Sequence, residues 1–576
     1  MKQTLTCLLL GSTLLLALHS CQDAQADDNN GNSPFEYREI YLPEGIEDTR
    51  TFHLNNLNND WGIWGHNLDV VLPARPSETI YAKQNSNTIH DQFCFSSDYL
   101  YRYIENYISD NFSATRTSRF AILPNDNSWV CLCHKCRELG NTQGNAAPAV
   151  FHMIRRLAER FPHHHFFTSW YQTTRHLPDD TLPANAGVLI SAMDYPPAAV
   201  STPQEEEFEK LLANWSRKTN KMYIWDYINN FDDYITPYPV FEMMQRRLQL
   251  YARNNVKGIF LNGSGTDYST LSDIKTYILS TLLQNPDTLW RPLLRTYCEE
   301  NYPVTGQAIR QFIIEQEDYV LQKGKPLPMY DGIDKALKTY LPEEAFNTLC
   351  DQLETLRSQT RSGEKKAVDK LADALQFTRL ELMRLRGNID NDPTEALRRL
   401  NRLNDDKIEI YNESCWTIDY YVRDYTTMYR HAEEMKDKNL LRGVKLIPRT
   451  PLDSDYDDIT ILTDGLLGLP SNYHCGQMIS SADPVLNIVI PYQPGMKRLR
   501  VCLTRNPAYH IALPQQVQLS CRGVEIGKTI PRPDIDRAGH SFVEFELPPN
   551  LKGELLLTLV RNPEVRTMAI DEIEAY

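Results

Sequence analysis

A carboxylate and a cluster of thiols follow one short apolar segment of the chain. Residues 120–123 predict a strand that ends at Pro124, because proline cannot donate a hydrogen bond to a sheet ladder. Asn125 and Asp126 come next, and Cys131-x-Cys133-x-x-Cys136 begins five residues after Asp126. Catalytic groups in α/β folds gather at the carboxyl ends of the strands. We therefore expect Asp126 to lie at the functional centre of the protein.

The thiol cluster has the spacing of a metal site. Three cysteine thiolates can hold zinc if a fourth ligand is present. Cys94, at the end of a neighbouring predicted strand, could supply that ligand, and His134 or the histidines 163–165 are alternatives. Disulfides fit the same spacing equally well in an exported protein. The candidate zinc ligands are Cys94, Cys131, Cys133 and Cys136. In either form the cluster would staple the loop that follows Asp126.

Asp126 and Asp226 are the predicted catalytic carboxyl groups. Glycoside hydrolysis needs an acid that protonates the leaving oxygen and, in most families, a second carboxyl group across the bond. The two aspartates follow the fourth and seventh predicted strands, which would lie across the mouth of a barrel from each other. Each has a structural alternative. Asp126 could be a turn or helix-cap residue, and Asp226 could accept a structural hydrogen bond from a neighbouring strand end.

Polar and aromatic side chains follow several other predicted strands. Aromatic rings at such positions can stack on sugar rings, although a tryptophan within a strand is more often a core residue. If the strands form one barrel, these side chains converge on a single face. The predicted substrate-binding residues are Asn125, His66, Tyr171, Asp194, Trp225, Tyr227 and Asn262.

Strand-like and helical patterns alternate between residues 50 and 285. This alternation indicates βαβ units and a parallel sheet. The predicted strands are 51–54, 68–72, 92–96, 120–123, 165–170, 188–192, 222–225 and 258–261. The helical patterns lie near 98–110, 146–160, 205–217, 239–254 and 267–283. Eight strands over this length predict a (β/α)8 TIM-like barrel, which we assign to residues 41–290.

Two further domains are predicted after the barrel. Residues 291–440 carry helical periodicity without recognisable chemistry and predict a helical bundle. Residues 441–576 hold short alternating strands between glycine and proline turns, a pattern typical of a β-sandwich. The clearest of those strands are 499–503, 517–521, 542–547 and 555–560.

The amino terminus carries an export signal. Lys2 and the apolar residues 8–18 predict a signal peptide over residues 1–20. The sequence Leu18-His-Ser-Cys21 resembles a bacterial lipobox, so Cys21 is the expected site of lipidation, with an ordinary secretory signal as the alternative. Residues 21–40 are polar and acidic near their start and predict a disordered tether. The acidic stretch resembles the surface-export signal of Bacteroidota-type lipoproteins. We expect a lipoprotein of the outer membrane that faces the cell surface.

Composition narrows the range of partners. The formal net charge is -15, which argues against nucleic acid, because phosphate binding requires basic patches. No glycine-rich dinucleotide fingerprint and no Gly-x-Ser-x-Gly element is present. We expect no catalytic cofactor.

Several motifs occur in the order seen in a known barrel family. These are Pro124-Asn-Asp126 with the cysteine cluster, Trp170-Tyr-Gln-Thr-Thr-Arg175, Tyr223-Ile-Trp-Asp-Tyr227 and Asn230-Phe231. Over residues 50–300 the chain resembles a domain family of unknown function found in secreted and lipidated proteins of gut bacteria. Part of that family is related to endo-β-N-acetylglucosaminidases that cut complex N-glycans. The α-glucuronidase barrels are similar more distantly. The segment from Leu462 onward is similar to discoidin-type carbohydrate-binding domains.

The resemblance implies a surface-anchored glycoside hydrolase that acts on complex glycans, with N-glycans as one implied substrate. In a β-N-acetylglucosaminidase the substrate's own acetamido group serves as nucleophile. Asp126 would then be the acid, and Asn125 or Asp226 would orient the acetamido group. Asp226 could instead be the nucleophile.

Many members of the family carry Glu-Gln-Gly at the end of the eighth strand, where this chain has Leu261-Asn262-Gly263. That difference favours the alternative, a non-catalytic glycan-binding lipoprotein on a hydrolase fold. A purely structural surface protein, the third hypothesis, would have no cleft at the strand ends.

Overall fold

The structure is a computed structural model that describes residues 33–198, 202–387, 391–480, 482–532, 538–551, 553–565 and 567–576. The predicted signal peptide, Cys21 and residues 21–32 of the predicted tether lie outside the described residues. Residues 37–40, also predicted as tether, instead belong to a strand of the central sheet.

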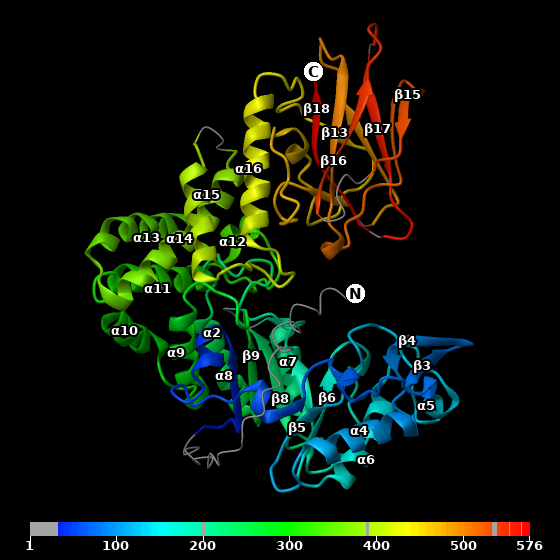
Figure 1. Ribbon diagram of the computed structural model, residues 1–576, viewed down its shortest axis with the longest axis vertical. Coiled ribbons are helices and arrows are strands. Elements are labelled where there is room, and N and C mark those ends of the chain that lie inside the picture. Colours follow the sequence, from blue (N-terminus) through cyan, green and yellow to red (C-terminus); the bar gives the residue numbers. More distant parts are fainter. Residues whose placement is uncertain are drawn as a thin grey trace.

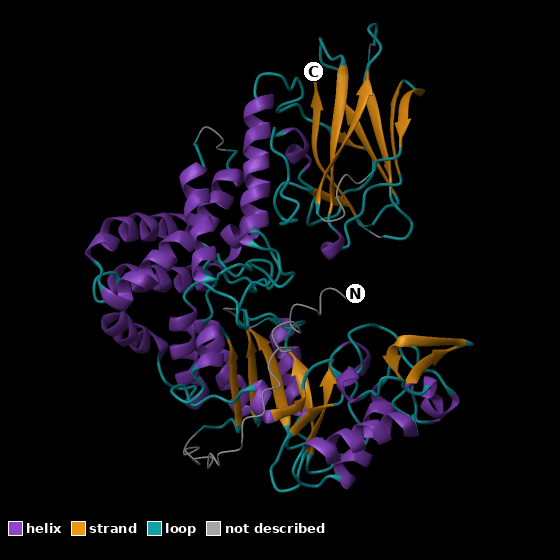
Figure 2. Cartoon of the chain, in the orientation of Figure 1, coloured by secondary structure: helices purple, strands orange, loops and turns teal. Residues whose placement is uncertain are grey.

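A parallel sheet of seven strands forms the centre of the amino-terminal half (Figures 1 and 2). Its order is β1-β9-β8-β7-β6-β5-β2, and every neighbouring pair is parallel. The strands are β1 (Tyr37–Tyr41), β2 (Trp61–Ile63), β5 (Arg119–Ala121), β6 (His165–Trp170), β7 (Ala186–Ser191), β8 (Met222–Tyr227) and β9 (Gly258–Asn262).

The sheet curls until its two edge strands approach each other. Inward-facing side chains of six strands pack into one cluster, which contains Tyr37, Trp61, Ala121, Phe167, Leu189 and Tyr223. The rings of Tyr37 on β1 and Trp61 on β2 are 5.9 Å apart. No ladder joins these two strands among the described residues. Asn55 covers the β1 edge instead, because its amide nitrogen donates to the Arg38 carbonyl (2.6 Å) and its side-chain oxygen accepts from the Arg38 amide (2.8 Å). The result is an incompletely closed barrel.

The first three predicted strands do not belong to the central sheet. Residues 51–53 form a turn, residues 68–71 form the 3-10 helix η1, and residues 92–93 end β4 (Asn87–Phe93). Strand β4 pairs with β3 (Tyr81–Gln84) in a separate hairpin. The sequence hid the true first strands for two reasons. Strand β2 has only three residues, and β1 carries charged residues in a buried position. The other five predicted strands correspond to β5 through β9, so seven strands replace the predicted eight.

Helices cover the outer face of the sheet, and each predicted helical pattern in this half forms one. They are α4 (Asp98–Asn111), α6 (Ala147–Arg160), α7 (Pro203–Trp215), α8 (Phe241–Arg253) and α9 (Ser272–Gln284). Helix α4 shows why they form. The Ser97 hydroxyl caps its first turn by accepting from Leu100 N, and Leu100, Ile104 and Ile108 line one buried face at four-residue spacing. Shorter helices are α2 (Pro43–Glu47), α3 (Leu57–Asp60) and α5 (His134–Glu138).

Helices dominate the middle of the chain. They are α10 (Trp290–Asn301), α11 (Gly306–Lys323), α12 (Ile333–Thr339), α13 (Glu343–Leu356), α14 (Ser362–Leu385), α15 (Thr394–Asn401) and α16 (Ile418–Met435). One hydrophobic core runs from the barrel into α10 through α14. No helix within the described residues is long and apolar enough to cross a membrane.

Two antiparallel sheets make up the carboxy-terminal part. Their orders are β10-β12-β17-β14-β15 and β11-β18-β13-β16, and side chains from both enclose one core. The strands are β10 (Ile447–Pro448), β11 (Met478–Ser480), β12 (Val485–Ile490), β13 (Arg498–Arg505), β14 (Gln516–Cys521), β15 (Val524–Thr529), β16 (Gly539–Glu546), β17 (Leu555–Val560) and β18 (Met568–Ala575).

Candidate active site

Asp126 lies on a loop at the carboxyl end of β5, and the β3–β4 hairpin fixes that loop. The Gln92 side chain, at the end of β4, accepts from the Asn125 amide (3.0 Å) and donates to the Asn125 carbonyl (3.1 Å). The Asn125 side chain donates in turn to the Asp91 carbonyl (3.0 Å). The backbone and the side-chain nitrogen of Asn125 thus hold the loop, whereas its Oδ1 is buried without a hydrogen-bond partner. Asp126 itself is half-buried.

Gln172 follows β6, the neighbour of β5 in the sheet, and its side chain reaches Asp126. Its side-chain nitrogen donates to Asp126 Oδ1 (2.6 Å) and to the Tyr171 hydroxyl (3.2 Å), just after the end of β6. The Gln172 φ is +43°, in the left-handed region that costs a non-glycine residue of order 1 kcal/mol or more. Backbone strain of this kind is often held at functional sites, and here it points an amide at Asp126.

Aromatic rings pack against one another near the carboxyl ends of the strands. Trp64, after β2, stacks on Trp225 of β8 with ring centroids 5.0 Å apart. His66 lies beside Tyr171, with centroids 5.7 Å apart, and its Nδ1 contacts the Pro124 carbonyl at 2.6 Å. The Tyr227 hydroxyl is 3.1 Å from Ser191 Oγ, and burial raises the pKa of Tyr227, so this phenol is neutral.

A second carboxyl group reaches this mouth from the helical region. Glu413 lies on the loop between η5 (Arg402–Asp406) and α16, and its backbone amide donates to the Phe231 carbonyl beyond β8 (2.8 Å). The Tyr330 hydroxyl donates to Glu413 Oε2 (2.8 Å). Burial raises the pKa of Glu413, and the negative charges of Asp232 and Asp126 raise it further. Glu413 is therefore a protonated carboxyl group over a wider pH range than an ordinary glutamate, within electrostatic reach of Asp126.

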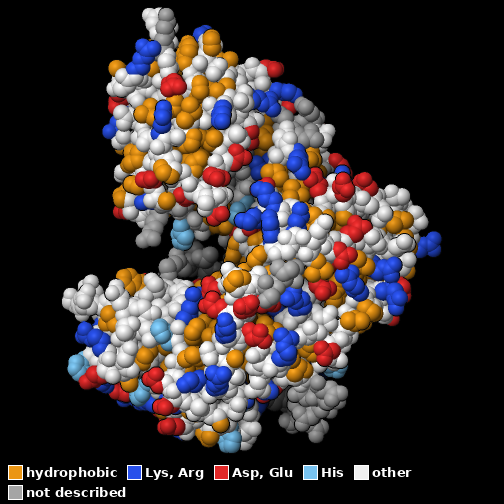
Figure 3. Space-filling view, turned by 180° about the vertical axis from the view of Figure 1, so that it is seen from behind, with side chains coloured by type: hydrophobic (Ala, Val, Ile, Leu, Met, Phe, Trp, Pro, Cys, Tyr) orange, Lys and Arg blue, Asp and Glu red, His pale blue; other side chains and the backbone are white. Residues whose placement is uncertain are grey.

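The carboxy-terminal part also contributes to the site. Asp232, 8% exposed, accepts hydrogen bonds from the Tyr473 hydroxyl (2.8 Å) and contacts His474 Nε2 (2.7 Å). These contacts tie the loop before β11 to the loop after β8. Seen from behind, the molecule is hollowed between its carboxy-terminal and amino-terminal bodies (Figure 3).

Asp226 does not face the mouth. Side chains alternate along β8, and because Tyr223 and Trp225 point into the barrel, Asp226 points outward toward α8. It is 1% exposed, pairs with Arg247 Nη1 (3.0 Å) and accepts from the Tyr251 hydroxyl. This placement contradicts the predicted catalytic role and matches the structural alternative.

Two predicted substrate-binding residues lie at the margin of the site. Asp194 is exposed and forms an ion pair with Arg175. Asn262 ends β9 opposite Tyr227 and is half-buried. His66 and Tyr171 lie beside the Asp126 loop, whereas Trp225 contacts Trp64 and Tyr227 contacts Ser191.

Sequence reasoning missed Glu413, Tyr330, Asp232 and His474. The helical region was predicted to carry no chemistry, and Glu413 and Tyr330 come from its loops. No periodicity or motif marks these residues. The nearest signal was Asn230-Phe231, a motif adjoining Asp232.

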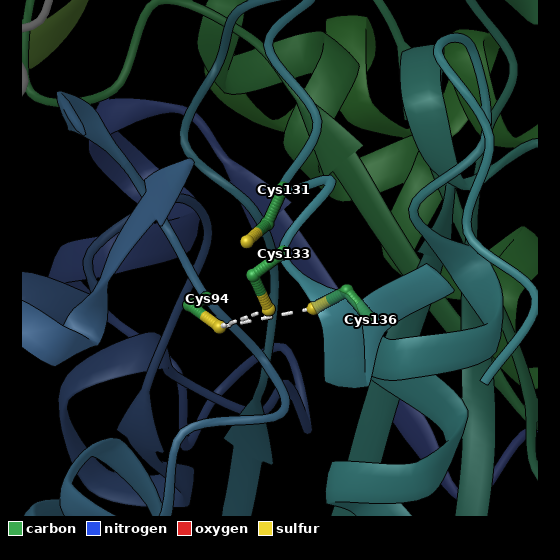
Figure 4. A group of neighbouring side chains, drawn as sticks. All are labelled: Cys94, Cys131, Cys133 and Cys136. Atoms are coloured by element: carbon green, nitrogen blue, oxygen red, sulfur yellow. Dashed lines mark hydrogen bonds between the residues drawn. The ribbon is translucent and has the colours of Figure 1, made fainter. Parts of the chain in front are cut away.

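The four predicted zinc ligands come together beside the site. Their sulfur atoms all lie within 4.8 Å of one another. His134, one of the alternative ligands, is exposed and contacts Glu138 at 3.1 Å. Figure 4 shows the sulfurs of Cys94, Cys133 and Cys136 close together, with Cys131 above them.

Residues 68–314 match a family described as a domain of unknown function, DUF4838. This match covers most of the curled sheet and its helices, and it bears out the resemblance to a domain family of unknown function. A search of curated proteins found no match.

Solved structures that align with the chain include glycoside hydrolases. A family GH115 4-O-methyl-α-glucuronidase with specificity for decorated arabinogalactans is 12% identical, with 86% of this chain and 68% of that chain covered at a TM-score of 0.35. A GH138 enzyme targeting pectin rhamnogalacturonan II is 8% identical, with coverages of 82% and 76% and a TM-score of 0.31. A CBM32 domain from a family 31 glycoside hydrolase of Clostridium perfringens is 15% identical, with coverages of 24% and 99% and a TM-score of 0.17. At these scores we draw no activity from the alignments.

Proposed function

We propose that the protein is a glycoside hydrolase in which Glu413 protonates the glycosidic oxygen and Asp126 is the second polar group of the reaction. The observation that carries this proposal is that the loop of Glu413 is hydrogen-bonded to the loop after β8, which places Glu413 within electrostatic reach of Asp126. It changes the sequence-based assignment, in which Asp126 was the acid and Asp226 its partner.

The environment of Glu413 suits an acid. Its raised pKa keeps the proton available, and a group that donates to the leaving oxygen must carry that proton when substrate binds. Tyr330 donates to Oε2, which leaves Oε1 for the proton and the glycosidic oxygen. As the proton leaves, the Tyr330 hydroxyl stabilises the carboxylate that forms.

Asp126 would act on the other side of the reacting carbon. Gln172 holds one of its oxygens, which fixes the direction of the carboxyl group. Asp126 would stabilise the positive charge that develops on the sugar ring. On a β-N-acetylglucosaminide it would instead orient the acetamido group, which is itself the nucleophile.

The aromatic side chains would form sugar subsites. Tyr330 is 40% exposed beside Glu413, and Tyr171 is half-buried beside Asp126. Rings at these two positions can stack on successive sugars across the bond to be cut. Complex glycans, N-glycans among them, are the substrates that we propose. The action would take place at the cell surface, where a lipid on Cys21 would anchor the protein in the outer membrane.

Glycan release by purified protein tests this function. Wild type, Asp126→Asn and Glu413→Gln are incubated with N-glycoproteins and a panel of complex glycans, and released products are analysed by mass spectrometry. We expect wild type to release glycan, and each variant to lose about 10²-fold or more of the rate, the range typical of acid catalysis. Glu409→Gln, an exposed carboxyl group in the same loop, is the matched control and should retain full activity.

Two results would change the proposal. If Glu413→Gln releases glycan at the wild-type rate, Glu413 is not the acid. If no form releases glycan but all bind the same glycans on an array, the protein is the non-catalytic glycan-binding lipoprotein, an alternative favoured by Asn262 at the end of β9.

A further inference from the structure

We propose that Cys94, Cys131, Cys133 and Cys136 bind one structural zinc ion, and that this ion fixes the loop that carries Asp126. The metal site stands independently of the proposed hydrolase activity. Only its consequence for Asp126 rests on that function.

The distances between the sulfurs fit a zinc tetrathiolate. Zinc–sulfur bonds are about 2.3 Å long, so two sulfurs on a tetrahedral zinc lie about 3.8 Å apart. The Cys94 sulfur is 3.7 Å from that of Cys133 and 3.7 Å from that of Cys136. A disulfide would need about 2.05 Å. One sulfur equidistant from two others at this length matches a shared metal better than a pair of bonded cysteines.

Two polar groups contact the four sulfurs, a backbone amide and one hydroxyl. The Lys83 backbone amide donates to Cys131 Sγ (3.3 Å). The Ser96 hydroxyl lies 3.1 Å from Cys136, 3.3 Å from Cys94 and 3.5 Å from Cys133. Four thiolates on one zinc carry a net charge of -2. The Lys83 amide, and the Ser96 hydroxyl toward one sulfur at a time, would donate to that charge and orient the ligands.

The ion would be structural because no coordination position is left for substrate. Four protein sulfurs complete a tetrahedron, whereas catalytic zinc keeps one position open. Cys94, Cys131 and Cys136 are also buried.

The ligands join the two segments that hold Asp126. Cys94 follows β4, two residues beyond Gln92, and the other three cysteines follow Asp126 on the loop after β5. Gln92 already binds the backbone of Asn125. Zinc would join the end of β4 to the part of the loop that follows Asp126. The chain would then be held both before Asp126, by Gln92, and after it, by the metal.

Metal analysis of the purified full chain tests the site. We expect one zinc per chain, and zinc X-ray absorption should give four sulfur neighbours at about 2.3 Å. A Cys133→Ser variant should lose the metal, whereas Cys350→Ser, a buried cysteine of α13, should keep it. Wild-type absorption data decide the question even if Cys133→Ser fails to fold. A metal-free protein in which these four cysteines resist alkylation until reduced would overturn the proposal in favour of disulfides.

Hydrogen exchange separates the metal site from the proposed activity. Removal of zinc by a chelator should speed amide exchange in residues 125–136 at least 10-fold and leave β12 and β17 unchanged. If zinc is bound but its removal leaves exchange in this loop unaltered, the ion does not position Asp126. Neither readout depends on whether any glycan is cut.

Discussion

At the scale of single residues, Glu413 makes the proposed activity depend on pH in a defined direction. Its raised pKa means that the proton is lost only at a higher pH than the ordinary glutamate value of about 4.5. The rate should therefore fall as pH rises through that raised pKa. We expect the alkaline limb of the kcat profile to disappear in Glu413→Gln, measured on a substrate with a good leaving group. An unchanged limb in this variant would assign the acid to another residue.

Asp226 is predicted to stabilise the fold without touching the chemistry. Asp226→Asn leaves the buried Arg247 without its ionic partner, and breaking a buried pair costs about 3–5 kcal/mol. Urea denaturation should show that loss in the free energy of unfolding, with kcat of the folded variant close to wild type. The control is Asp194→Asn, whose exposed ion pair with Arg175 is worth about 0–1 kcal/mol. A stable Asp226→Asn protein without activity would restore the catalytic assignment.

At the scale of elements, the unusual feature of the barrel is the seam between its edge strands β1 and β2, which no ladder joins among the described residues. Glu39 points into the barrel at this seam and is 2% exposed. Its carboxyl group accepts from the Tyr37 hydroxyl and from the backbone amide of Leu57 (3.0 Å), the first residue of α3. One side chain thus links β1 to the helix that leads into β2, in place of a sheet ladder.

Glu39 should make the fold less stable at high pH. Burial raises its pKa to about 8, whereas the unfolded chain ionises near 4.5. The folded state therefore holds a proton that the unfolded state has lost between these values, so stability falls as pH rises from about 4.5 to about 8. The loss attributable to Glu39 is at most about 5 kcal/mol, at about 1.4 kcal/mol for each pH unit.

Glu39→Gln should remove this dependence, because an amide keeps the contacts and cannot ionise. Melting temperatures of both proteins at pH 5 and pH 8 measure the effect. Equal pH dependence in the two proteins would show that Glu39 does not titrate with the fold.

At the scale of the whole molecule, the loop after β8 joins three parts of the chain. Its Phe231 amide donates to the Met329 carbonyl (2.7 Å), its Phe231 carbonyl accepts from Glu413, and Asp232 binds His474 and Tyr473. The site therefore exists only when the barrel, the helical loops and the carboxy-terminal part are assembled together.

Asp232→Ala should loosen this assembly without unfolding its parts. Loss of the buried carboxylate leaves Tyr473 and His474 without their partner, at a cost of about 1–3 kcal/mol. We expect faster hydrogen exchange in residues 471–477 and a lower kcat/KM, with exchange in β6 and β7 unchanged. Wild-type exchange at residues 471–477 would show that other contacts hold the carboxy-terminal part in place.

The sequence by itself determined the features that depend on near neighbours in the chain. Strands β5 through β9 and the helices between them follow from apolar periodicity, because this pattern is set by residues that are close in the chain. The link between Asp126 and the thiol cluster is of the same kind, because all but Cys94 lie within one short segment.

Only the tertiary structure decided which carboxyl groups meet. The predicted catalytic role of Asp226 is wrong because neighbouring side chains along a strand point to opposite faces of the sheet. The sequence did not reveal which face of β8 is lined by rings from other strands. Strand β1 was hidden because a glutamate within it is buried by partners from α3 and from its own strand. Glu413 and Asp126 lie far apart along the chain, and no local pattern encodes that proximity. It arises because the loop that carries Glu413 hydrogen-bonds to the loop after β8.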